Sequence, residues 1–339
     1  MADTKRNRLL FWGGGHNDYS GNEVYSLDLT RVGLCTSSNP CMTRLDNFSP
    51  AAANSGQSVE QIPCTTGSGL NCPTARHTYD ELTYVTSKDV MFSVGGGLNY
   101  NGGGFGVWEL SLSSVPQSCA PTCTPIWTRD TDYHEANYGY TTVYDPVHNR
   151  TFVSDSTYLY YYDFGKSTWT RAGTASYGDY NGTAIYDDHD QYMIRIGCYS
   201  TCGIHYWSLA TGSSYKMNSP AIDSSCTTAV GSYTGFAWDP LARLAVIYPG
   251  SGNTIWLLDP STWKCTTETY GSTIGVDYPP NMNSGMAVFG KHFSYFPAMD
   301  IFTACNDYAN NCWYLRRRRG NARSTTVFPS GSSGESKRH

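Results

Sequence analysis

A unit made of a short apolar run, a glycine-rich loop and a second extended run recurs along this chain. Its first copy has an apolar run at 9–12, three consecutive glycines at 13–15 and an extended segment at 24–28. Because glycine adopts positive φ freely, a run of three interrupts a strand. Weaker copies follow at 91–97 with 107–110, and at 245–250 with 254–259. A strand–turn–strand unit repeated every roughly 40–50 residues predicts the blades of a β-propeller.

Six such units can be aligned, each with four strands, which predicts an all-β fold with almost no helix. Their bounds are 8–46, 76–129, 138–171, 180–217, 232–266 and 283–328. We therefore expect one propeller domain over 1–328, followed by a Gly/Ser-rich tail at 329–339 that does not fold. A truncated N-terminus would make room for a seventh blade.

One turn recurs between the first two strands of the units. Its clearest copy is 145–150, and it returns at 187–192, 239–244 and 3–8. Since the chain starts on the last of these, we expect the innermost strand of the first blade to be missing from the N-terminal sequence. Either the segment 325–328 supplies that strand and closes the ring, or the chain is a shortened form of a longer protein.

The composition suits a fold with many tight turns, since the chain has 34 Gly, 27 Tyr and only 15% charged residues. The net charge of −5 gives no general attraction to nucleic acid. The run Arg316–Arg319 is either a solvated strand end or a contact for a polyanion. No apolar run reaches the roughly 18 residues of a membrane span, and no signal peptide is recognisable.

The chain has 12 cysteines, and most of them form pairs that are close in sequence. An even number arranged in short loops predicts disulfides, and therefore a secreted or extracellular protein. Zinc is the alternative, but the pairs lack the C-x2-C spacing of zinc sites. We expect the bridges Cys35–Cys41, Cys64–Cys72, Cys119–Cys123, Cys198–Cys202, Cys305–Cys312 and Cys226–Cys265.

Histidines and tyrosines gather on one mouth of the predicted channel. Successive strands of a blade alternate in direction, so the loops after the second and fourth strands share one face. Propeller ligands bind at such a mouth. The candidates placed there are His16, His77, Asn99, Tyr138, Tyr180 and Tyr233. Each can also have a purely structural role, since the tyrosines can fill the channel and the histidines can brace their loops. No cofactor is expected, although a structural metal ion is compatible with the sequence.

The units resemble kelch-type repeats of the galactose-oxidase-like propellers. The glycines at 13–15, the segment 24–28 and the tryptophans Trp127, Trp169 and Trp263 of the outer strands carry the likeness. Kelch motifs indicate a fold rather than an activity. A copper-radical oxidase of this group needs a crosslinked Cys–Tyr pair and two copper histidines. Here the cysteines pair with one another and no His-His doublet exists, so we do not expect that chemistry.

A narrower resemblance is to the propeller lyases that cleave ulvan-type uronic-acid polymers. Those enzymes use a histidine and a tyrosine at the channel mouth and an arginine on the strand after the tyrosine. His77, Tyr180 and Arg195 match these positions and would be the catalytic residues. Asn99 stands where such enzymes carry a second histidine. With His16, Tyr138 and Tyr233 it would bind an acidic polysaccharide substrate.

The chemistry of β-elimination accounts for these residue types. The C5 proton of a uronate becomes acidic enough only when the neighbouring carboxylate is neutralised, which Arg195 with Asn99 could do. His77 or Tyr180 could take the proton, and a tyrosine could protonate the leaving oxygen. A structural ion pair of Arg195 with Asp155 or Asp179 is the alternative for that residue.

Two other functions remain open at this point. One is a non-catalytic propeller that binds carbohydrate or protein. The other is a glycoside hydrolase with paired carboxylates, such as Asp18 with Asp155 or Asp179, which would have to lie roughly 5–10 Å apart.

Overall fold

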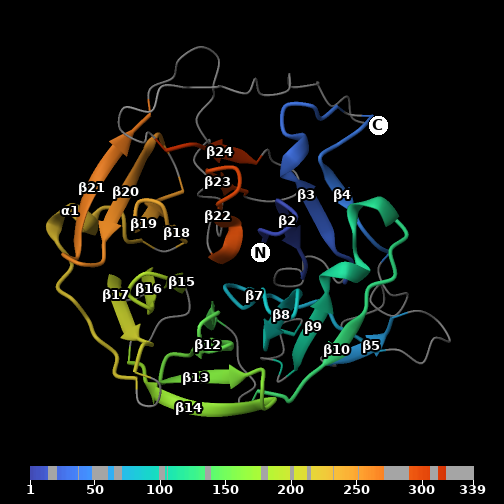
Figure 1. Cartoon of the computed structure of the whole chain (residues 1–339), viewed down its shortest axis with the longest axis horizontal. Helices are drawn as coiled ribbons and strands as arrows, with labels where there is room; N and C mark the ends of the chain where they lie inside the picture. Colours follow the sequence, from blue (N-terminus) through green and yellow to red (C-terminus); the bar gives the residue numbers. More distant parts are fainter. Residues whose placement is uncertain are drawn as a thin grey trace.

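A computed structural model of the chain describes residues 1–13, 21–36, 38–47, 60–64, 71–98, 104, 106–133, 139–176, 182–198, 202–211, 215–231, 233–250, 252–270, 290–305 and 312–317. In these residues the strands form six antiparallel sheets arranged in a ring, as Figure 1 shows. Each sheet is one blade, and neighbouring strands of a blade follow one another in sequence. The fold is therefore a six-bladed β-propeller, as the repeats predict.

Four blades have four described strands each. Blade 1 has β1 (Ala2–Asp3), β2 (Arg8–Phe11), β3 (Tyr25–Asp28) and β4 (Met42–Arg44). Blade 2 has β7 (Leu82–Val85), β8 (Val90–Val94), β9 (Val107–Ser111) and β10 (Trp127–Arg129). Blade 3 has β11 (Thr141–Asp145), β12 (Arg150–Ser154), β13 (Tyr158–Asp163) and β14 (Thr168–Thr174). Blade 5 has β18 (Gly235–Asp239), β19 (Leu244–Tyr248), β20 (Thr254–Asp259) and β21 (Lys264–Thr269).

The other two blades have three described strands each. Blade 4 has β15 (Gly182–Asp187), β16 (Tyr192–Cys198) and β17 (Cys202–Ser208), and a bridge between Tyr206 and Asn218 begins a fourth. Blade 6 has β22 (Phe293–Phe296), β23 (Ile301–Ala304) and β24 (Trp313–Leu315). A separate hairpin joins β5 (Gln61–Pro63) to β6 (Asn71–Pro73), and α1 (Ser224–Thr227) precedes blade 5. No described helix is long and apolar enough to cross a membrane.

The hydrophobic core is divided into six clusters, one between each pair of neighbouring blades. An inner strand is therefore buried on both faces, which is why 90–94 in β8 is buried at every position. Since successive side chains of a strand point to opposite faces, each inner strand serves two clusters. In β16, Met193 packs toward blade 3, whereas Ile194 and Ile196 pack toward blade 5.

The turn that recurs in the sequence also recurs in the structure. It begins with a fully buried aspartate in blades 1, 3, 4 and 5, at Asp3, Asp145, Asp187 and Asp239. One carboxylate oxygen of each accepts hydrogen bonds from backbone N–H groups two or three residues later. The residue four positions after the aspartate has a positive φ in each case: Asn7, Asn149, Gln191 and Arg243.

The ring closes differently from the sequence expectation. Ala2–Asp3 forms β1 and pairs with β2, so the N-terminal residues themselves supply the innermost strand of blade 1. This strand was missed because it has only two residues, too few for a visible pattern. β1 contacts β22 of blade 6 on one side and β7 of blade 2 on the other. Segment 325–328 and the tail 329–339 lie outside the described residues.

One boundary prediction was also wrong. Trp263 lies in the turn before β21 with φ 57°, not in the outer strand, whereas Trp127 and Trp169 do lie in β10 and β14. Here an aromatic residue next to a strand occupies the turn instead, which strand propensity alone does not distinguish. Tyr233 also lies in a turn, with φ 64°, two residues before β18.

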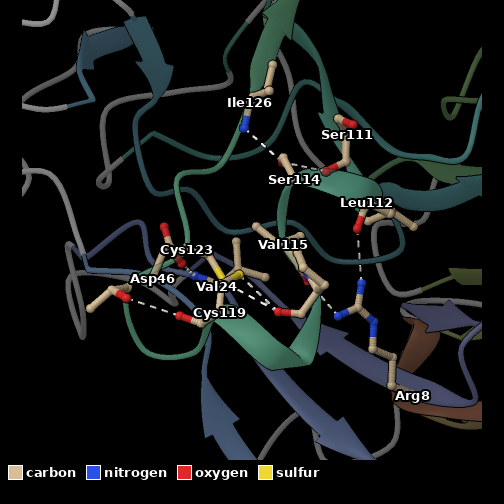
Figure 2. The surroundings of a disulfide bond; sticks show 12 residues. Arg8, Val24, Asp46, Ser111, Leu112, Ser114, Val115, Cys119, Cys123 and Ile126 are labelled. Carbon is tan, nitrogen blue, oxygen red and sulfur yellow. Dashed lines mark hydrogen bonds between the residues drawn. A yellow bond between two sulfur atoms is a disulfide. The ribbon is translucent and has the colours of Figure 1, made fainter.

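All six predicted disulfides are present, and there are no free cysteines. The Cys119–Cys123 bridge closes a loop of blade 2 that rests on blade 1, where the Cys123 N–H donates to the carbonyl of Leu45 (2.9 Å). Figure 2 shows Arg8 of blade 1 reaching the same connection, with bonds to the carbonyls of Val115 (2.7 Å) and Leu112 (3.5 Å). Blades 1 and 2 are thus joined by polar contacts as well as by apolar packing.

Candidate functional site

Three of the seven predicted site residues, His77, Arg195 and Tyr233, lie within the described part of the chain. The other four, His16, Asn99, Tyr138 and Tyr180, lie outside it, as do Asp18 and Asp179 of the alternative roles. The site is therefore built from the first three and from the groups around them.

Arg195 lies in the middle of β16, opposite Ala184 of β15 and His205 of β17. The alternation along β16 directs its side chain toward blade 3, on the same side as Met193. The residue is only 1% exposed. Its guanidinium lies against the backbone of Gly182, where an added Cβ would come within 2.2 Å of Nη2. Glycine at 182 is therefore what makes room for this guanidinium.

The ion-pair alternative for Arg195 involved Asp155, whose carboxylate is engaged elsewhere. One oxygen accepts the backbone N–H groups of Thr157 (2.6 Å) and Tyr158 (2.5 Å), which closes the turn between β12 and β13. The hydroxyl of Tyr133 donates to the other oxygen at 3.4 Å. These bonds give Asp155 a structural role in the turn between β12 and β13.

His205 is a polar neighbour of Arg195 that the sequence did not single out. It is half-buried, and its Nδ1 lies 2.9 Å from the Ser219 hydroxyl. An added Cβ at Gly203 would lie 2.7 Å from its Nε2. Only the register of β16 and β17 places this imidazole beside the arginine, and register cannot be read from a single strand.

His77 is held before β7 by a two-way backbone bridge to Gly97, with bonds of 2.9 and 3.0 Å. Its ring stacks on that of Tyr79, with 3.9 Å between the centroids, and the side chain is half-buried. The backbone bridge and the stacked ring fix the imidazole while leaving part of it accessible. Such a group is suited to accept or donate a proton.

Two buried charged groups flank His77. The Arg76 guanidinium donates to the carbonyls of Thr74 (3.1 Å), Gly95 (2.9 Å) and Glu60 (3.0 Å), and to the Glu60 carboxylate (3.2 Å). Burial lowers the pKa of Arg76. Sequence reasoning passed over Arg76, whose only signal was a position in the polar run before an apolar strand.

Glu81 is the second of these groups and is completely buried. One of its oxygens accepts the N–H groups of Gly139 (2.7 Å) and Tyr140 (3.2 Å) of blade 3. The other has no hydrogen-bond partner among the described residues and faces Gly96. Burial raises the pKa of Glu81 well above its usual value.

Asp80 links the segment of His77 to the blade of Arg195. The hydroxyl of Thr183 donates to one of its carboxylate oxygens (2.9 Å), and the Ala184 N–H donates to the other (3.0 Å). Ala184 is the residue directly across from Arg195. The segment that follows His77 is therefore hydrogen-bonded to the innermost strand of blade 4.

Tyr233 is half-buried and precedes the innermost strand of blade 5. Its turn is held by Thr234, whose hydroxyl contacts Gly231 N (3.1 Å) and the carbonyl of Ala229 (3.3 Å). Among the described residues, no group of three His, Cys, Asp or Glu side chains is placed to hold a metal ion. The described site thus consists of imidazole, guanidinium, phenol and carboxyl groups.

No known protein family model matches the chain, and a search of curated proteins finds no significant relative. The function is therefore inferred from the fold and from the residues of the site. A propeller with six disulfides is compatible with a secreted enzyme or a secreted binding protein.

Proposed function

We propose that the protein is a secreted polysaccharide lyase that cleaves a uronic-acid-containing polymer by β-elimination at the channel mouth. The observation that carries the proposal is Arg195, a guanidinium on an inner strand for which Gly182 leaves space. Arginine is rarely so completely buried in proteins. A guanidinium makes bidentate contacts with a carboxylate, which is the group that β-elimination must neutralise.

The proposed reaction assigns one role to each group. Arg195, helped by Asn99, neutralises the uronate carboxylate and so acidifies the C5 proton. His77 takes this proton, and the electron pair of the C5–H bond forms the C4–C5 double bond. The C4–O bond breaks at the same time, and Tyr180 donates a proton to the leaving oxygen. His16, Tyr138 and Tyr233 would contact the sugars on either side.

The likeness to kelch-type propellers and to ulvan-cleaving lyases belongs to this proposal. It rests on the glycine-rich unit at 13–15 and on the positions of His77, Tyr180 and Arg195. The half-buried, stacked imidazole of His77 and the link from Asp80 to the strand across from Arg195 are consistent with it. The substrate class follows from the chemistry, since only a uronate presents a carboxylate next to the proton to be removed.

A second candidate is binding of such a polymer without cleavage. It is favoured by the 1% exposure of Arg195, because a guanidinium so well covered must be uncovered before a sugar can reach it. In this case Arg195 would support the strand pair of blade 4, and the half-buried groups of the mouth would make the contacts.

The two candidates are separated by a cleavage assay on a panel of uronic-acid polymers, with the ultraviolet absorbance of the unsaturated product as readout. If the enzyme hypothesis holds, Arg195→Ala lowers the turnover number by roughly 10²–10³-fold or more. Arg195→Lys recovers little, because an ammonium cannot make the paired contact of a guanidinium. Arg171→Ala, which removes an exposed arginine of β14, is the matched control and leaves activity unchanged.

Thermal unfolding of the same variants shows whether Arg195 is structural. A melting temperature that falls strongly in Arg195→Ala, with cleavage by the remaining folded protein intact, removes Arg195 from the mechanism. A wild-type protein that retains the polymers on affinity gels but releases no unsaturated product supports the binding candidate. Failure to bind or cleave any uronic-acid polymer rejects both.

A further inference from the structure

Lys291 reaches across the propeller from blade 6. It lies in the turn Gly290–His292 that leads into β22, and Figure 1 shows this region beside the centre of the ring. Its ammonium donates to the Asp80 carboxylate (3.1 Å) and to the carbonyls of Thr142 (2.9 Å) and Ala184 (2.8 Å). These three oxygens belong to blades 2, 3 and 4. Because blade 3 lies opposite blade 6 in a ring of six, the side chain reaches oxygens on the far side of the ring from its own blade.

Hydrogen bonds that do not involve Lys291 hold the oxygens of this pocket in place. Asp80 is fully buried, and its carboxylate accepts from the Thr183 hydroxyl (2.9 Å), Ala184 N (3.0 Å) and Thr142 N (3.4 Å). The hydroxyl of Thr142 in turn donates to the Asp80 carbonyl at 2.7 Å. All the described partners of the carboxylate are donors, which is the environment of an ionised group. Burial opposes this by raising the pKa of Asp80, and Lys291 lowers it.

The chemistry of the pocket is that of a site for a monovalent cation. It offers one carboxylate oxygen and two neutral carbonyl oxygens, all within 3.1 Å of one nitrogen. The buried N-terminal amine of Met1 also interacts electrostatically with this pair, but burial and the Lys291 charge lower its pKa to about 5. At neutral pH one negative charge therefore balances one positive charge, and an ammonium has three N–H groups for three acceptors. A buried carboxylate needs such a partner, since an uncompensated buried charge is strongly destabilising.

We propose that the oxygens of Asp80, Thr142 and Ala184 form an axial cation site that the chain fills with its own Lys291. The lysine thereby locks blade 6 to the three blades opposite. It follows that a protein without this lysine holds a free monovalent cation, such as ammonium, at the same place. The proposal does not depend on the lyase activity: the lock shares Asp80 and Ala184 with the site described above, but Arg195 and His77 are not among the groups that bind Lys291.

Lys291→Ala tests the site by chemical rescue. The variant should melt below the wild type in tetramethylammonium chloride, whose cation has no N–H group and is too large for the pocket. Replacing this salt by ammonium chloride at constant ionic strength should raise the melting temperature. Above the dissociation constant we expect a rise of roughly 2 °C for each tenfold increase in ammonium. The wild type, whose site is filled, should not respond.

Two controls make the rescue specific. Lys291→Met fills the space with an apolar side chain and should show no ammonium effect, and neither should the double variant Lys291→Ala with Asp80→Ala. An equal response of the wild type would mean a general salt effect and would overturn the proposal. So would a folded Lys291→Ala protein that responds to neither ammonium nor potassium.

A measurement on the unmodified protein keeps the proposal testable if these variants do not fold. Reductive methylation followed by peptide mass mapping compares Lys291 with Lys166, whose side chain is 71% exposed. Lys166 should be methylated completely while Lys291 stays unmodified in the native protein, although its side chain is 20% exposed. Equal rates at the two lysines would contradict an ammonium held by three oxygens.

Discussion

The turns of blades 4 and 5 share their local geometry and differ in how a buried charge is balanced. Asp187 and Asp239 are both completely buried, and one oxygen of each accepts two backbone N–H groups at 2.9–3.2 Å. The other oxygen of Asp239 binds the guanidinium of Arg317 at 2.6 Å. The corresponding oxygen of Asp187 has no hydrogen-bond partner among the described residues.

This comparison separates the turn geometry, which depends on local sequence, from the charge balance, which depends on distant residues. The hydrogen bonds from backbone N–H groups to the turn aspartate, which we call the cap of the turn, depend on an aspartate at the first turn position. Each unit of the repeat can supply this residue by itself. The charge balance in blade 5 comes from a residue 78 positions away, after the last described strand of blade 6. In blade 4 the neighbouring charges are those of Asp188 and Asp190, which add to burial in raising the pKa of Asp187. Turns with the same local geometry therefore contribute differently to the stability of the fold.

Loss of the distant cation is expected to have the largest effect. Arg317→Met removes the guanidinium that pairs with the buried carboxylate of Asp239 and with Glu268, which Arg317 binds at 2.7 Å. Breaking a buried pair in this way costs about 3–5 kcal/mol of unfolding free energy. Denaturant unfolding with the disulfides intact measures it. Arg316→Met is the matched control, because within the described residues that exposed arginine donates a hydrogen bond only to the carbonyl of Met299 (3.0 Å). Equal losses in the two variants would contradict a specific role for Arg317.

A buried carboxylate outside these turns, Asp46 of blade 1, extends the comparison to pH. Its oxygen accepts Val24 N at 2.7 Å beside the Cys119–Cys123 bridge (Figure 2). Burial, with a smaller effect of Glu23, raises the pKa of Asp46 to about 7 from 3.8. Folding therefore takes up a proton between these values, and the free energy of unfolding falls as pH rises from about 4 to about 7. The fall amounts to at most roughly 4 kcal/mol.

Asp46→Asn removes this titration and should flatten the pH dependence by that amount, since the amide oxygen can still accept Val24 N. Asp223→Asn is the opposite control. The Ser225 hydroxyl and backbone N–H lower the pKa of the exposed Asp223, so its contribution is present at neutral pH and lost in acid. Unfolding curves at several pH values decide the matter. A slope unchanged by Asp46→Asn would show that Asp46 does not titrate in this range.

The two turns themselves are compared by the same substitution. Asp239→Asn keeps the cap but loses the charged bond to Arg317, at a cost of about 1–3 kcal/mol at neutral pH. Asp187→Asn keeps the cap and removes a charge that burial and two acidic neighbours oppose, so its stability at neutral pH should be unchanged or higher. The gain should disappear in acid, because the raised pKa of Asp187 costs stability only once pH exceeds its normal value. A loss in Asp187→Asn as large as in Asp239→Asn would point to a cation at blade 4.

The same distinction explains how much could be predicted from the sequence. The propeller, its six units, its turns and all six disulfides follow from local repeats and short spacings. Asp80 and Glu81 were missed because their partners lie in other blades, and His205 was missed because its place beside Arg195 depends on strand register. Arg76 was missed because its partners Glu60 and Gly95 lie 16 and 19 residues away along the chain. Lys291 meets Asp80 across 211 residues, which no local pattern reveals. The candidate site was therefore predicted by residue type and not by its contacts.

The smallest expected effect concerns the fourth residue after the turn aspartate. Gln191 and Arg243 both adopt a positive φ, of 53° and 55°, where a side chain crowds the backbone. In blade 4, Gln191→Gly should relieve this crowding and stabilise the protein by a few tenths of a kcal/mol to about 1 kcal/mol, partly offset by the extra freedom of glycine when unfolded. Ala242→Gly in blade 5 is the matched control, since Ala242 is not among the residues with positive φ. There only the entropic cost remains, and stability should fall by about 0.5–1 kcal/mol. If the melting temperature rises in Gln191→Gly and falls in Ala242→Gly, the positive φ acts on stability independently of the charge balance, because both blades share this φ but differ in charge balance. A lower melting temperature in both variants would show that the crowding at Gln191 is negligible.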